Sequence, residues 1–177
     1  NLADSAGYLM PDDVKERIGA VLDAVEIPVG FHAHNNLGMA IANSLAAVQA
    51  GVSYLDGTLR GLGAGAGNAQ IELLAAVLKR NGIEMGADFY GLMDLAQDVV
   101  EPMMLRPQVI DNGSMMLGYA GVYSSFLLHV YDAAAKNDLD PRDILVELGR
   151  RGMVGGQEDM IIDVAYQLKN SAAAGRR

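Results

Sequence analysis

The first eighty residues alternate short apolar runs with amphipathic stretches of helical spacing, and this alternation limits the folds open to the chain. The expected strands are 27–34, 52–59 and a segment ending near residue 7; the expected helices are 10–25, 37–50 and 69–82. Strands that alternate with helices in this way predict a parallel sheet covered by helices. Asn36 is expected to cap the helix that follows the strand 27–34.

We predict an α/β fold in which these units form the C-terminal portion of a (β/α)8 TIM barrel. A complete barrel takes roughly 250 residues, so three strand–helix units make up only part of one. On the pattern alone, a small doubly wound parallel sheet remains an alternative, because it uses the same alternation.

The pattern changes after Gly86, where helical stretches follow one another without an intervening strand. The expected helices are 88–104, 114–137, 141–151 and 157–170. We therefore expect two parts, with strand–helix units in 1–87 and an all-helical domain in 88–177. The last seven residues, 171–177, are expected to form a frayed tail.

The composition excludes several classes of function. A formal net charge of −9 over 177 residues disfavours binding to nucleic acid or to an anionic membrane. The absence of cysteine excludes a disulfide framework and thiolate chemistry. The apolar runs are too short to cross a bilayer and no signal peptide opens the sequence, so the expected location is the cytoplasm.

Two histidines, His32 and His34, lie at the end of the apolar run 27–34. Residues i and i+2 of a strand point to the same side, so both rings are expected to face one side. The carboxyl end of a parallel strand is where α/β enzymes place their chemistry. We favour half of a divalent metal site, to be completed by a carboxylate. The alternative is two polar side chains satisfied by hydrogen bonds at a strand end.

Two further stretches carry candidate residues, and each also has a simpler structural interpretation. The glycine-rich segment 61–68 can cradle an anion, but it lacks the lysine of a phosphate-binding loop, and a tight loop is the better interpretation. Asp56 and Arg60 flank this segment and are expected to help close the site. Tyr119 and Tyr123 share one face of the expected helix 114–137, where core or interface packing is the simpler role.

Five stretches together resemble one known family. They are DSAG (4–7), GFHAHNNLGMAIANSLAAVQAG (30–51), LDGTLRGLGAGAGNAQIE (55–72), GYAGVYSSFLLH (118–129) and MVGGQEDMIIDVA (153–165). The chain resembles the 4-hydroxy-2-oxovalerate aldolases, the pyruvate aldolases of aromatic meta-cleavage pathways, over essentially its whole length. The histidine pair and the glycine-rich loop are shared with a wider barrel group that includes hydroxymethylglutaryl-CoA lyase and isopropylmalate synthase. The last two stretches are specific to the aldolases.

The resemblance implies a metal-dependent TIM-barrel aldolase with a helical communication domain. This domain docks an acylating acetaldehyde dehydrogenase, to which the aldehyde passes through a channel. The implied cofactor is a divalent metal, most often Mn²⁺, held here by His32 and His34, with His32 also against the substrate. Ser5 and Tyr123 are the other implied substrate contacts. The implied reaction is the retro-aldol cleavage of 4-hydroxy-2-oxovalerate to pyruvate and acetaldehyde, with the metal as Lewis acid.

One part of the family pattern has no counterpart in this sequence. The third metal ligand, an aspartate, the neighbouring arginine and the catalytic histidine base come from the first barrel strand of the family. We therefore expect no catalytic base within these residues, and we expect residues 1–177 alone neither to close a barrel nor to turn over substrate. Two alternatives stay open: an acyl-CoA Claisen-type synthase or lyase on the same barrel, and a partner-binding helical module without activity.

Overall fold

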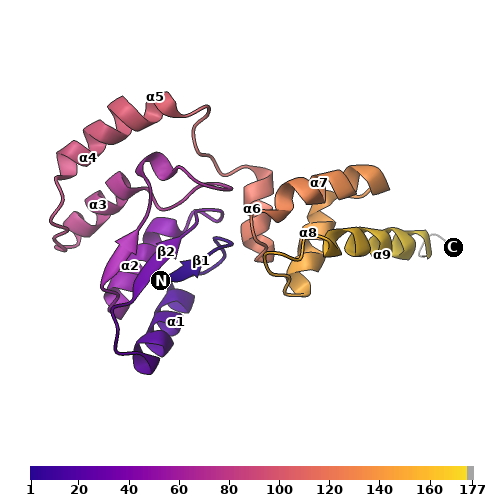
Figure 1. The fold of residues 1–177 in the computed structure, drawn as a ribbon, viewed down its shortest axis with the longest axis horizontal. Coiled ribbons are helices and arrows are strands. Elements are labelled where there is room, and N and C mark those ends of the chain that lie inside the picture. Colours follow the sequence, from indigo (N-terminus) through magenta and orange to yellow (C-terminus); the bar gives the residue numbers. More distant parts are fainter. Residues whose placement is uncertain (175–177) are drawn as a thin grey trace.

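The computed structural model describes residues 1–174 of the chain, and Figure 1 shows an α/β part beside a cluster of helices. The strands are β1 (Leu2–Asp4), β2 (Gly30–Ala33) and β3 (Tyr54–Asp56), in the order β1-β2-β3. Both pairs of neighbouring strands are parallel, and the helices α1 (Pro11–Ala24), α2 (Ala40–Ala50) and α3 (Ile71–Arg80) follow them in turn. The predicted α/β fold with a helical domain after it is confirmed.

The two faces of the sheet differ because neighbouring strand residues point to opposite sides. Phe31 and Ala33 are fully buried on the face that α1 and α2 cover, in a core that also contains Val14 and Ile18. His32, between them in sequence, points to the other face. The apolar core on one side thus fixes which side receives the histidine.

A long bent helix follows α3 and packs on the α/β part. It consists of α4 (Phe89–Leu95), a π-helical turn (Ala96–Val100) and α5 (Glu101–Met103). α4 packs on α3, and the π-helical turn packs on the 3₁₀ turn Leu59–Gly61. The boundary that we place between residues 87 and 88 stays a prediction.

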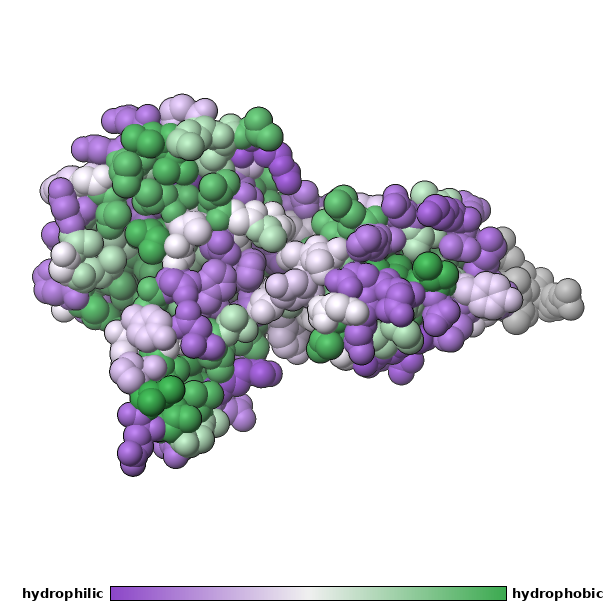
Figure 2. Space-filling model, in the orientation of Figure 1, coloured by the Kyte–Doolittle hydropathy of each residue, from purple (hydrophilic) through white to green (hydrophobic). Residues whose placement is uncertain are grey.

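Apolar side chains are exposed along this bent helix. They include Tyr90, Met93, Val99 and Met103. Figure 2 shows hydrophobic residues over the upper part of the α/β half. None of the helices in residues 1–174 has both the length and the apolar character that a bilayer crossing requires.

The last four helices form a separate core. They are α6 (Asn112–Ala120), α7 (Phe126–Asn137), α8 (Pro141–Arg150) and α9 (Met160–Ala174). Leu117, Phe126, Val130, Leu148 and Val164 are all fully buried in this core. Each of the four helices therefore packs one apolar face into this core.

The prediction of one continuous helix over 114–137 is wrong. The chain forms α6 and α7, and Gly121 ends α6 in the left-handed conformation with φ of 69°. Glycine adopts this conformation without steric cost and commonly stops a helix there. Tyr119 therefore lies in α6 and Tyr123 in the turn between the helices, so they do not share one helical face.

Two smaller expectations also need correction. Asn36 does not cap α2: Met39 occupies the N-cap position, and the Asn35 side chain accepts the Ala40 amide at 3.2 Å. Helix α9 continues through Ala174, so residues 171–174 of the expected tail are helical, and 175–177 lie outside the described residues.

Asn36 instead joins three loops at the carboxyl ends of the strands. It is fully buried, its Nδ2 donates to the Ala6 carbonyl at 2.9 Å, and its Oδ1 accepts the Ala66 amide at 2.9 Å. Ala6 belongs to the turn after β1, and Ala66 belongs to the glycine-rich loop after β3. One amide side chain thus fixes the turns after all three strands relative to one another.

We expect Gly149→Ala to destabilise the helical cluster by about 1–3 kcal/mol, because small-to-large changes at closed contacts cause overpacking. A Cβ at Gly149 of α8 would overlap the carbonyl oxygen of Ala120 and lie 3.2 Å from its Cβ. The matched control is Gly19→Ala in α1, where a Cβ meets nothing within 4 Å. The control is expected to be neutral or stabilising by roughly 0.5–1 kcal/mol. Urea unfolding followed by circular dichroism measures both, and equal effects would contradict the described packing.

We expect Asn36→Ala to cost about 1–3 kcal/mol in the free energy of unfolding, because it leaves the Ala66 amide buried without an acceptor. Hydrogen–deuterium exchange should show faster exchange at Ala66. Asn170→Ala, at an exposed position of α9, is the control and should change the unfolding free energy by less than about 0.5 kcal/mol. Unchanged exchange at Ala66 in the Asn36 variant would show that the three loops are held by other contacts.

Candidate functional site

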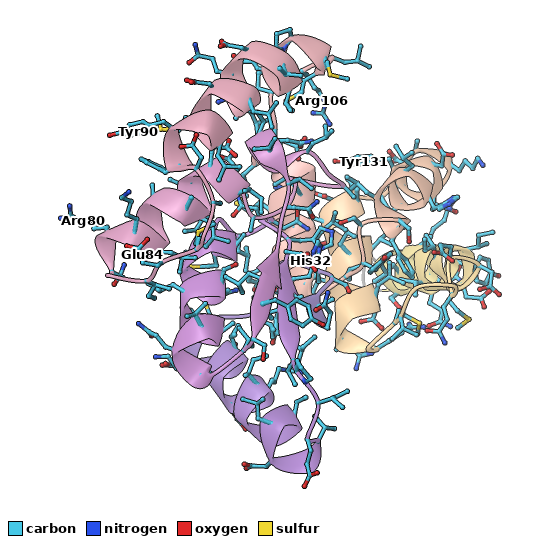
Figure 3. All side chains as sticks on the ribbon, turned by 60° about the vertical axis from the view of Figure 1, so that its left-hand side comes forward. His32, Arg80, Glu84, Tyr90, Arg106 and Tyr131 are labelled. Atoms are coloured by element: carbon cyan, nitrogen blue, oxygen red, sulfur yellow. The ribbon has the colours of Figure 1, made fainter. Side chains whose placement is uncertain are left out.

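The candidate site lies at the carboxyl ends of the three strands. Because the strands are parallel, Asp4, His34 and Asp56 reach the same edge of the sheet. His32 is directly opposite Asp56 in the strand register, and Figure 3 shows His32 on the sheet in the middle of the molecule. The predicted strand-end location of the histidines is thus observed.

The two histidine rings lie together, and each uses its Nδ1 atom for a contact with a neighbouring strand. The ring centroids are 5.0 Å apart in an edge-to-face arrangement. The Nδ1 of His34 donates to the Asp4 carbonyl at 3.1 Å, and the Nδ1 of His32 contacts Oδ1 of Asp56. A carbonyl oxygen only accepts, so the proton of His34 is on Nδ1 and its Nε2 has a free lone pair.

Burial shifts the pKa values of two groups where β1 meets His34: the His34 ring and the Asp4 carboxyl. Burial lowers the pKa of His34, assisted by the charge of His32 and opposed by the hydrogen bond to the Asp4 carbonyl. Burial likewise raises the pKa of the Asp4 carboxyl, against the lowering effect of the Tyr8 and Leu9 amides that donate to it. The lowered pKa keeps His34 neutral near pH 7, the form in which imidazole binds a metal.

The side chains present fit part of a divalent metal site. Histidines that bind metals usually donate their other ring nitrogen to a carboxylate or a carbonyl, and both histidines here have such an acceptor. Asn68, whose backbone bridges to His34, has a buried side-chain oxygen without a hydrogen-bond partner. Within residues 1–174 no group of three or more His, Cys, Asp or Glu side chains is arranged to hold a metal. The described residues therefore fit part of a ligand set and not a complete one.

The glycine-rich loop folds back over the strand ends, and three of its amides are hydrogen-bonded within the protein. The amides of Ala66, Gly67 and Asn68 donate to Asn36 Oδ1, the Ala64 carbonyl and the Gly61 carbonyl, respectively. Amides that already have protein acceptors are not available to an anion. The tight-loop interpretation is the better one.

Arg60 does not close the site as expected. Its guanidinium lies 2.9 Å from Glu101 of α5, and its backbone amide donates to Glu72 of α3. These contacts hold Arg60 with a φ of 56°, which is unfavourable for a residue with a side chain. Arg60 therefore ties the loop after β3 to the bent helix, whereas Asp56 does face the histidines.

Ser5 and Tyr123 lie on different parts of the structure, Ser5 directly after β1 and Tyr123 in the helical cluster. Ser5 begins the turn directly after Asp4, whose carbonyl receives the His34 ring. Tyr123 lies in the turn between α6 and α7 and its ring borders Gly155. Its neighbour Ser124 places an unpartnered, buried Oγ against Gly65 of the glycine-rich loop. The structure thus joins the helical cluster to the strand ends through Ser124, and no contact joins the Tyr123 side chain to the histidines.

Sequence reasoning missed two residues of the site. Asn36 and Asn68 follow the histidine pair and the glycine run, and their burial depends on how distant loops meet. Asp56 differs from these two, because its place at the end of the neighbouring parallel strand predicts that it lies close to His32 once the strand order is known.

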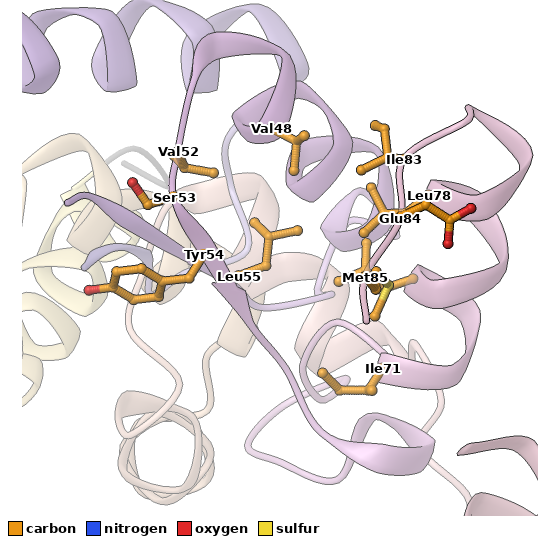
Figure 4. Close-up of a pocket in the computed structure, with 11 residues that line it drawn as sticks. Val48, Val52, Ser53, Tyr54, Leu55, Ile71, Leu78, Ile83, Glu84 and Met85 are labelled. Carbon is orange, nitrogen blue, oxygen red and sulfur yellow. The ribbon is translucent and has the colours of Figure 1, made fainter. Parts of the chain in front are cut away.

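An apolar groove lies elsewhere on the α/β part. It has a volume of about 410 Å³ and lies between β3, α2 and α3 (Figure 4). Its lining is mostly apolar and includes Val48, Leu55, Leu74 and Met85. No histidine lines it, so it is separate from the strand-end site.

Comparisons with known proteins cover both parts of the chain. Residues 1–99 match the HMGL-like family, and residues 108–170 match the DmpG-like communication domain. A 4-hydroxy-2-oxovalerate aldolase from Moorella thermoacetica is 70% identical over 168 residues, which are 95% of this chain and 50% of that protein. The chain spans about half the length of the curated relatives it matches.

Solved structures support the fold. The N-terminal domain of a putative aldolase from Bacteroides vulgatus superposes with a TM-score of 0.64 at 30% identity, covering 71% of this chain and 42% of that one. A pyruvate carboxylase from Rhizobium etli superposes with a TM-score of 0.73 at 18% identity, covering 96% of this chain and 16% of that one, a likeness of fold alone. The chain belongs to the HMGL-like family, and it joins part of that family's fold to a DmpG-like communication domain.

Proposed function

We propose that this chain is the C-terminal part of a metal-dependent 4-hydroxy-2-oxovalerate aldolase. The observation that carries the proposal is the histidine pair at the strand ends, with both Nδ1 atoms engaged and both Nε2 atoms left for a metal. The 70% identity to the aldolase of Moorella thermoacetica supports the substrate, and the matched communication domain supports the two-part organisation. We place the protein in the cytoplasm.

His32 and His34 are the proposed metal ligands, with Mn²⁺ as the proposed ion. When bound, a divalent cation supplies Lewis-acid polarisation of the 2-oxo group of the substrate. The Nδ1 contacts orient the two rings, so groups of the protein itself position the proposed ligands. Residues outside this chain complete the ligand set and supply the base.

Ser5 and Tyr123 are the proposed substrate contacts together with His32. Ser5 directly follows the last residue of β1, and we propose that its hydroxyl donates a hydrogen bond to a 2-oxo acid held at the histidines. Tyr123 brings a second hydroxyl from the helical cluster, whose turn packs on the glycine-rich loop. In the overall reaction the 4-hydroxyl proton leaves to a base, and the C3–C4 bond breaks to release acetaldehyde. The electron pair of that bond stays with C3, which takes up a proton to give pyruvate.

The helical cluster is the proposed docking element for an acylating acetaldehyde dehydrogenase, which takes up the aldehyde through a channel. Several apolar side chains of the cluster are exposed and offer a surface for such a partner: Tyr119, Leu128, Tyr131, Ile162 and Tyr166. A fragment of residues 88–177, which lacks the strands, tests this docking role. Capture of the dehydrogenase by the fragment supports docking through the helices. Capture by the whole chain alone contradicts it.

We expect His32→Ala and His34→Ala, made in the full-length parent protein, each to lower Mn²⁺ affinity by more than about 100-fold. Loss of a direct ligand should exceed the 10–100-fold effect typical of its supporting partners. Calorimetric titration of the metal-free protein with Mn²⁺ measures this, with turnover as a second readout. His129→Ala is the matched control, because His129 is exposed on α7. Wild-type affinity in either site variant would refute the assignment of that histidine.

We expect the full-length parent to release pyruvate from 4-hydroxy-2-oxopentanoate only with a divalent metal, and residues 1–177 alone to release none. The described residues supply two histidine ligands and form a sheet of three strands, which is less than a closed barrel. A coupled pyruvate assay with and without chelator measures both. Consumption of acetyl-CoA by the parent without pyruvate release would favour a Claisen-type enzyme, and turnover by residues 1–177 would refute the proposed division of the site.

A further inference from the structure

Asp56 has a separate partner for each of its carboxylate oxygens: His32 on β2 and Asn1, the residue before β1. Its Oδ1 contacts Nδ1 of His32 on β2, and its Oδ2 accepts a hydrogen bond from Nδ2 of Asn1, beside β1, at 2.7 Å. Asp56 itself is on β3, directly opposite His32 in the register. One carboxylate thus connects all three strands on the face that carries the histidines.

Gly30 makes room for this connection. A Cβ at Gly30 would overlap the Asn1 side-chain oxygen and the Tyr54 ring. Gly30 is two residues before His32 on the same face of β2, so the absence of a side chain there lets Asn1 cross toward Asp56. The Asn1 contact leaves Asp56 with its other oxygen directed at His32.

The two histidines are supported by different kinds of acceptor. His34 donates to a backbone carbonyl, whose position is fixed by the strand, whereas His32 faces a side-chain carboxylate. A carboxylate acceptor holds the proton on Nδ1 and makes Nε2 a stronger electron-pair donor than a carbonyl does. A mutation of Asp56 can remove the acceptor of His32, whereas the backbone acceptor of His34 stays in place. The two histidines can therefore be tested separately.

We propose that Asp56 is the positioning residue of His32: it fixes the Nδ1–H tautomer and directs Nε2 toward the metal. This inference rests on the proposed function, in which His32 and His34 hold the metal. Asp56 acts through His32 and is not itself a ligand in this account. Asn1 orients Asp56 in turn.

The test compares Asp56→Ala and Asp56→Asn in the full-length parent protein. The first variant removes the acceptor, and the second keeps an oxygen acceptor of similar shape without the charge. Mn²⁺ affinity is measured by electron paramagnetic resonance of the free ion. The histidine tautomers are measured in the metal-free protein by ¹⁵N–¹H correlation spectra of the rings. Asp132→Asn, at an exposed position of α7, is the control for loss of a negative charge.

We expect Mn²⁺ affinity to fall by about 10- to 100-fold in Asp56→Ala, less in Asp56→Asn, and not at all in Asp132→Asn. We also expect the His32 tautomer to change in Asp56→Ala, while that of His34 stays Nδ1–H. An affinity of Asp56→Ala within twofold of wild type would overturn the inference. A loss of affinity without a change in the His32 tautomer would overturn it as well, because Asp56 would then act by another route.

The histidine variants separate this inference from the proposed function. If His32→Ala and His34→Ala lose Mn²⁺ and Asp56→Ala does not, the metal site stands and only the positioning role fails. If the histidine variants bind Mn²⁺ with wild-type affinity, the metal site itself is refuted, and the positioning role falls with it. Thermal unfolding of each variant, followed by circular dichroism, shows whether the fold is retained.

Discussion

The hydrogen bond from the His34 ring to the Asp4 carbonyl is the interaction on which the candidate site depends. It joins the ends of β1 and β2, and the same carbonyl also accepts the His34 and Gly7 amides. The strand pairing therefore determines the tautomer of His34, and burial of the ring keeps it neutral. With His32 held from β3 by Asp56, both rings are oriented by the sheet and not by a flexible loop.

The helical cluster is linked to this edge of the sheet by close backbone packing. A Cβ at Gly118 of α6 would lie 3.1 Å from both the Gly7 carbonyl and the Asn36 side chain. The turn after α6 then places Ser124 against Gly65. Small residues thus allow the second part of the chain to approach the strand ends.

The sequence predicts the strand–helix units, the parallel direction of the strands and the position of the histidines at a strand end. Each of these depends on local periodicity and on strand direction. It fails at the helix 114–137, since an apolar pattern of period 3.6 runs on past Gly121, and only the left-handed conformation of that glycine shows the break. It also fails for Asn36 and Arg60. Their local positions suggest a helix cap and a site residue, whereas contacts with residues about thirty and forty positions away decide their roles.

The central claim is that the His32 and His34 Nε2 atoms bind one divalent metal ion. A crystal structure of the full-length parent grown with Mn²⁺, with anomalous data collected at the manganese edge, tests it most directly. We expect one anomalous peak within bonding distance of both Nε2 atoms, with both Nδ1 contacts to Asp4 and Asp56 retained. A peak bonded to an Nδ1 atom, or located away from the histidine pair, would contradict it.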